Sequence, residues 1–113
     1  MLTSGDVVDL DLGVPSGRGA GFRHPAVVVT AQGVLDESPN VVQVVPLTSN
    51  VRGFSSEVGS TADDHNGLTV DSAAQCQHIR SVSMGRVESV RGNVGSATIT
   101  EIRQVLALLM DRS

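Results

Sequence analysis

The chain has 113 residues, a hydrophobic fraction of 40% and a formal net charge of −4. This length accommodates one domain, residues 1–113, and the hydrophobic fraction is sufficient for a real core. The acidic balance excludes a general electrostatic attraction to nucleic acid, so a nucleic acid could bind only in a local groove.

The cellular compartment can be inferred from cysteine use and from the apolar segments. The single cysteine, Cys76, excludes an internal disulfide and fits a reducing compartment. The first residues show neither the basic region nor the apolar stretch of a signal peptide. The longest apolar stretch, residues 105–110, is far shorter than a membrane span. We therefore expect a soluble, cytoplasmic protein without membrane association.

The first half of the chain is rich in valine, which favours strands because β-branched side chains pack well on a pleated surface. Residues 6–12 alternate, with Val8, Leu10 and Leu12 on one face, and this predicts a half-buried strand. Residues 13–24 contain four glycines and one proline, which predicts a long loop that is either functional or disordered. Residues 25–31 and 41–48 are apolar β-branched runs and predict buried strands.

The middle of the chain contains shorter elements. Residues 33–40 carry turn residues, and residues 54–58 predict a short strand. Residues 60–67 form a polar loop, and residues 68–82 predict extended structure that is interrupted at Asp71 and Ser72. Residues 83–86 predict one helical turn, and residues 87–94 return to extended structure.

The C-terminal segment changes to helical periodicity. Its apolar residues recur at helical spacing: Ile99, Ile102, Val105, Leu106, Leu109 and Met110. Thr98 and Glu101 have the spacing of a capping box. Several strands followed by one terminal helix favour a small antiparallel β-barrel with the helix on its surface.

Four segments together resemble the MazF/PemK family of toxin–antitoxin endoribonucleases. They are GDVVDLDL (5–12), the glycine-rich loop leading into RHPAVVV (23–29), VVPLTS (44–49) and DSAAQCQHIRSV (71–82). Their order and spacing, with the terminal helix, extend the resemblance over nearly the whole chain. Any one of the four segments alone would be a weak indication.

The resemblance implies a mainly β fold with a C-terminal helix, the SH3-like antiparallel β-barrel of MazF, CcdB and Kid. It also implies a homodimer with single-stranded RNA in a groove across the dimer interface. A cognate antitoxin would cover that groove with a disordered, acidic segment. Cleavage at short sequence motifs would require neither a metal nor another cofactor.

Metal-independent RNA cleavage uses the neighbouring ribose 2′-OH as nucleophile and leaves a 2′,3′-cyclic phosphate and a 5′-OH. It requires a base, an acid, and cations or donors for the phosphorane. The resemblance assigns this work to an arginine directly before the proline of the second segment and to the threonine of the third. By position the threonine is Thr48, and Ser49 beside it would contact the RNA.

The second segment departs from the family at its catalytic position. His24 directly precedes Pro25, and Arg23 lies one position earlier. Adjacent strand side chains point to opposite faces, so the two cannot simply exchange roles. Either His24 acts as acid and base while Arg23 stabilises the phosphorane, or Arg23 reaches in from a distorted strand end, or the site is impaired. An ordinary pKa of about 6.5 suits His24 for both proton transfers; the alternative is a surface histidine at the mouth of a loop.

Three further residues, Arg18, His78 and Arg80, are candidates for RNA contacts. Arg18, in the glycine-rich loop, would contact the RNA backbone if that loop is a flap rather than a plain connector. His78 would form part of a groove wall, and Arg80 would bind phosphate or pair with a carboxylate. Cys76 and His78 would share a strand face at i and i+2, but two ligands are too few for a zinc site.

Two other functions remain open. One is a non-catalytic, gyrase-binding toxin of the CcdB type, although the C-terminus lacks the aromatic ending associated with that activity. The other is an impaired family member that still binds its antitoxin, and its only support is the order of Arg23 and His24.

Overall fold

The computed structural model describes residues 1–12 and 23–111. The strands are β1 (Asp6–Asp11), β2 (Arg23–Val28), β3 (Val41–Thr48), β4 (Glu57–Ser60), β5 (Ser72–Gln75), β6 (Arg80–Ser83) and β7 (Val87–Asn93). The helices are α1 (Gln32–Leu35) and α2 (Ser96–Leu109), with 3-10 turns η1 (Cys76–His78) and η2 (Met84–Arg86). None of the helices in these two ranges is long and apolar enough to cross a membrane.

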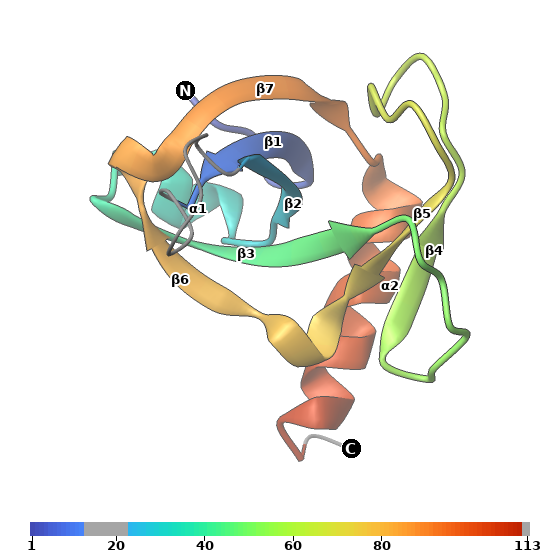
Figure 1. The fold of residues 1–113 in the computed structure, drawn as a ribbon. Helices are drawn as coiled ribbons and strands as arrows, with labels where there is room; N and C mark the ends of the chain where they lie inside the picture. The colour runs from blue at the N-terminus through green and yellow to red at the C-terminus, as the bar shows by residue number, and fades with distance from the viewer. Residues whose placement is uncertain (13–22, 112–113) are drawn as a thin grey trace, which may run out of the picture.

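The strands form one antiparallel sheet that curves around a common interior (Figure 1). Its order is β4-β5-β3-β2-β1-β7, and β6 pairs with the first half of β3. Within the described residues no pairing joins β7 to β4, so the sheet is barrel-like but not closed. The predicted antiparallel β-barrel architecture with a C-terminal helix is confirmed, although the sheet of the described residues does not close on itself.

The valine runs lie in the three central strands, β1, β2 and β3, which are largely buried on both faces. Neighbouring residues alternate between two core clusters. The first takes Val7, Val27 and Val45, and the second takes Val8, Val28 and Val44. The prediction of a half-buried first strand is therefore wrong at Val7, which is also fully buried.

Helix α2 completes the first cluster with Ile99 and Ile102. The predicted helix is confirmed, but the predicted capping box is wrong. The helix begins at Ser96 with Gly95 as its N-cap, so Thr98 and Glu101 already lie inside the helix.

Two short elements differ from the prediction because of specific contacts. The predicted turn at 33–40 begins with helix α1, which buries Leu35 in the second cluster. The predicted strand at 54–58 starts only at Glu57. The Glu57 carboxylate accepts the backbone N–H groups of Arg52 and Gly53 at 3.0 and 2.9 Å, which holds the preceding residues in a loop.

The region from 72 to 83 is extended at both ends but not in its middle. Strand β5 ends at Gln75, and η1 turns the chain before β6 begins at Arg80. The expectation that Cys76 and His78 share a strand face is therefore wrong. The predicted helical turn at 83–86 and the strand that follows are confirmed as η2 and β7.

Candidate active site

His24, at the start of β2, lies between two surface hollows. The first, of about 400 Å³, is lined by His24 together with Leu10, Leu12, Val44, Pro46, Gln75, His78 and Arg80. The second, of about 300 Å³, is lined by His24 together with Pro25, Leu47, Thr48, Ser49, Leu68, Thr69, Val70, Ser72 and Arg91. Of the residues that the structure describes, His24 alone lines both of these hollows.

The environment of His24 favours its neutral form. Its side chain is partly buried, and this burial lowers its pKa below the ordinary 6.5, while a hydrogen bond with the Leu47 backbone acts in the opposite direction. The neutral form of an imidazole is the form that can accept a proton. The lowered pKa thus favours the neutral form of His24, which is the form that a general base requires.

Thr48 and Ser49, two residues with hydroxyl side chains, line the second hollow. Thr48 ends β3, and its Oγ1 accepts the backbone N–H of Asn50 at 3.0 Å. The β2–β3 register, with Ala26 opposite Pro46, runs the end of β3 alongside the start of β2. Because a hydroxyl that accepts one hydrogen bond still has its own proton to donate, Thr48 remains able to bind a phosphate oxygen.

His78 and Arg80 lie in the first hollow, apart from Thr48 and Ser49. Both side chains are exposed. The structure therefore brings the predicted residues together in two sets that meet at His24. One set is Thr48 and Ser49, which line the second hollow, and the other is His78 and Arg80, which line the first.

Of the two arginines in the second predicted segment, the structure describes only the backbone of one. Arg18 and the side chain of Arg23 lie outside the described residues. The backbone of Arg23 pairs with Asp11, and the β1–β2 register continues without a shift from Arg23 to Val27. The start of β2 is therefore a regular strand, without the distortion that one of the alternatives for Arg23 required.

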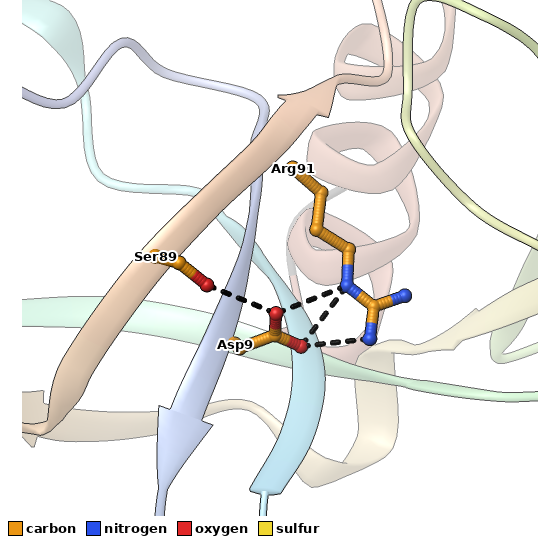
Figure 2. Close-up of polar contacts among 3 residues, drawn as sticks. All are labelled: Asp9, Ser89 and Arg91. Carbon is orange, nitrogen blue, oxygen red and sulfur yellow. Dashed lines mark hydrogen bonds and ion pairs between the residues drawn. The ribbon is translucent and has the colours of Figure 1, made fainter.

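The structure adds Arg91 of β7, which sequence reasoning missed, to the second hollow. Its Nη2 lies 2.8 Å from Oδ1 of Asp9, and its Nε donates to the same carboxylate at 3.0 and 3.1 Å. Ser89 Oγ donates to Asp9 at 3.0 Å (Figure 2). The only sequence signal was an i, i+2 pair of polar residues on β7, which does not show where the arginine points.

Cys76 is not available for site chemistry. It is fully buried in the first core cluster, and burial raises its pKa to about 11, which keeps the thiol protonated. Within residues 1–12 and 23–111 no group of three or more His, Cys, Asp or Glu side chains is placed to hold a metal ion.

Comparison with known proteins identifies the family. Residues 3–110 match the family described as PemK-like, MazF-like toxin of type II toxin–antitoxin system. The chain is 31% identical over 116 residues to "Endoribonuclease MazF9" of Mycobacterium tuberculosis (strain ATCC 25618 / H37Rv), with 98% of each covered.

Solved structures agree with this match at the level of the fold. A MazE–MazF structure from Deinococcus radiodurans (Form-II) superposes with a TM-score of 0.80 at 24% identity, over 99% of this chain and 97% of the other. The Mycobacterium tuberculosis toxin MazF-mt6 gives 0.77 at 18% identity, over 96% and 98%. The resemblance carried by the four sequence segments is confirmed: the chain belongs to the PemK-like, MazF-like family of toxins of type II toxin–antitoxin systems.

Proposed function

We propose that this chain is an endoribonuclease toxin that cleaves single-stranded RNA at short sequence motifs, without a metal ion. The observation that carries the proposal is that His24, whose pKa is lowered by burial, lines the same hollow as Thr48 and Ser49. Family membership and the name of the curated relative, an endoribonuclease, support RNA as the substrate.

The proposed reaction is an internal transesterification. His24 takes the proton of the ribose 2′-OH, O2′ bonds to the adjacent phosphorus, and the bond from phosphorus to the 5′-oxygen breaks. The leaving 5′-oxygen takes a proton from solvent, and the imidazolium then returns its proton to solvent. Thr48 donates a hydrogen bond to a non-bridging oxygen, where negative charge develops. The products carry a 2′,3′-cyclic phosphate and a 5′-OH.

The first hollow would hold the RNA next to the cleaved bond. His78 and Arg80 line it, and His24 connects it to the second hollow. A planar guanidinium suits bidentate phosphate binding, and an exposed imidazole can stack on or hydrogen-bond to a base. We therefore propose that the strand passes His24 from one hollow to the other and that His78 contributes to motif selection.

The proposed partners are a second copy of the chain and a cognate antitoxin with a disordered, acidic segment. The solved MazE–MazF structures of Deinococcus radiodurans support an antitoxin partner. We place the activity in the cytoplasm, where cellular RNA is found. The acidic segment would compete with RNA for the same local cationic groups.

The test is incubation of purified, antitoxin-free protein with long single-stranded RNA in EDTA, followed by mapping of the product ends. We expect discrete cuts with a 2′,3′-cyclic phosphate on one product and a 5′-OH on the other. An RNA oligonucleotide that contains the cleaved motif should also be cut, and the same oligonucleotide with a single 2′-deoxyribose at the cleaved position should remain intact. Intact RNA after incubation with folded protein would contradict the proposal, and inhibition of gyrase without RNA cleavage would favour the CcdB-type alternative.

A further inference from the structure

We propose that Arg91 of β7 contacts the scissile phosphate and that Asp9 of β1 positions the Arg91 guanidinium. This inference rests on the proposed function and adds the cation that the transition state requires. It is carried by the position of Arg91 in the sheet, by its contacts with Asp9 and by the charges in the second hollow.

Arg91 occupies an irregular position in its strand. Val7 of β1 is opposite Gly92 of β7, but the next residue, Val8, is opposite Val90. Arg91 is therefore the extra residue of a β-bulge between β1 and β7. A bulge bends its strand and redirects a side chain, and bulges are over-represented next to active sites. Here the redirected side chain lines the hollow that contains Thr48 and Ser49.

Asp9 holds one edge of the guanidinium and leaves the other edge accessible. The carboxylate contacts Nε and Nη2, and Figure 2 shows the remaining terminal nitrogen pointing away from it. The Arg91 side chain is 32% exposed, whereas that of Asp9 is 16% exposed. A ligand in the hollow could therefore reach the arginine while Asp9 keeps its orientation.

The backbone that carries Arg91 is fixed by the loop that also lines the hollow. A Cβ on Gly67 would lie 2.4 Å from the Arg91 carbonyl oxygen, and a Cβ on Gly92 would lie 2.2 Å from the His65 carbonyl oxygen. Asn93 N–H also donates to that His65 oxygen at 2.8 Å. The next residues of the loop, 68–70, form part of the hollow wall. The cation and the wall are therefore positioned together before a ligand binds, as electrostatic catalysis requires.

Charge makes Arg91 a suitable partner of the phosphorane. Among the described residues that line the second hollow, Arg91 alone carries a permanent positive charge. In the proposed reaction His24 begins as the neutral base, and the chain as a whole is acidic. The developing negative charge therefore has no other fixed cation among these residues, and a hydroxyl from Thr48 would not neutralise it.

The experiment compares Arg91→Gln, Arg91→Lys and Asp9→Asn with the wild-type protein on an RNA that has one cleavage site. We expect Arg91→Gln to lower kcat by about 100- to 1,000-fold, with a much smaller change in KM. Lysine should restore part of the loss. Asp9→Asn should have a smaller effect and should add little to Arg91→Gln in the double variant, because it acts through Arg91.

Arg103→Gln is the matched control, since it removes the same charge from α2, where the arginine bonds to Ser4 Oγ. It should cut like the wild type. If the ion pair is only a structural link between β1 and β7, Arg91→Gln will lower thermal stability, but the folded protein will keep a kcat within about threefold of wild type. That outcome would overturn the inference and leave the proposed function intact.

A second measurement separates the two proposals if the wild type does not cut. Binding of an uncleavable, 2′-deoxy-substituted RNA is measured against salt concentration. Loss of one phosphate contact in Arg91→Gln should reduce the slope of log K against log salt by about 0.7. Equal affinity and equal slope in wild type and variant would overturn the role of Arg91, whatever the fate of the proposed cleavage.

Discussion

His24 and Arg91 have complementary electrostatic properties, although they come from different strands. Partial burial lowers the pKa of the His24 imidazole, and the Asp9 carboxylate contacts the Arg91 guanidinium at 2.8 Å. A neutral base and a fixed cation around two hydroxyls are the groups that 2′-OH attack requires. Histidine before Pro25 can therefore supply the base of the reaction in a family whose resemblance placed an arginine there, provided that a cation comes from elsewhere.

The pH profile tests the role of His24. Because its pKa is lowered, kcat/KM should stay constant near pH 7 and fall with one-proton dependence only below pH 6.5. His24→Gln should lower kcat/KM by about 100-fold or more and should remove this acid limb. Steady-state cleavage from pH 4.5 to 8 measures both effects. His65→Gln, in the exposed loop, is the matched control and should keep the wild-type profile.

The lowered pKa of His24 should also make the free energy of unfolding depend on pH. The folded protein takes up the His24 proton at lower pH than the unfolded chain, so the unfolded state binds more protons between the two pKa values. The contribution of neutral His24 to the free energy of unfolding is fully present above pH 6.5 and is lost as the pH falls through the lowered pKa. Denaturant unfolding of His24→Gln should lack this component, and an unchanged pH dependence would argue against a buried, neutral imidazole.

At the scale of elements, the contact between β7 and the loop at residues 61–70 connects the fold to the site. The loop is held by Asn66, whose side chain bonds to the backbone of Asp63, Thr61 and Leu68. It approaches β7 so closely that glycine is required at two facing positions. The bulge at Arg91 and the wall of the second hollow therefore depend on one packing contact.

Gly92→Ala tests that dependence. The added Cβ would meet the His65 carbonyl oxygen at 2.2 Å, and separating the loop from β7 should cost about 1–3 kcal/mol of unfolding free energy. We also expect lower kcat, because the loop and Arg91 lose their shared placement. Gly59→Ala in β4, where nothing lies within 4 Å of the new Cβ, is the matched control for urea unfolding and cleavage. Equal stability of both variants would contradict this account.

At the scale of the whole molecule, a net charge of −4 coexists with a proposed site for a polyanion. Binding therefore depends on a few local cations rather than on the overall field. In one chain His24 connects two hollows of about 400 and 300 Å³, which together would accommodate only a short stretch of RNA. A second copy that continues the groove would extend the contact with the strand.

The proposed homodimer is checked by light scattering. We expect twice the 11.7 kDa of one chain at micromolar concentration. Dilution should reduce specific activity at the concentration where the dimer dissociates, because the RNA groove would lose one of its walls. A monomer with full activity at every concentration would exclude the dimeric groove.

The sequence by itself determined the antiparallel strands, the C-terminal helix and the family. The valine runs specify strands that are buried on both faces, the spacing from Ile99 to Leu106 specifies a helix, and four ordered segments identify the toxin family. His24 and Thr48 could be proposed from these segments, and the structure brings both to one hollow.

Tertiary structure alone decided which residues share a hollow. Arg91 meets Asp9 across 82 positions of sequence, and its direction depends on a bulge between β1 and β7. The start of β4 and helix α1 likewise follow from specific contacts rather than from local pattern. Local patterns report periodicity and burial, because these depend on neighbours along the chain. Strand register and bulges depend on partners far along the chain, and so only the folded molecule determines them.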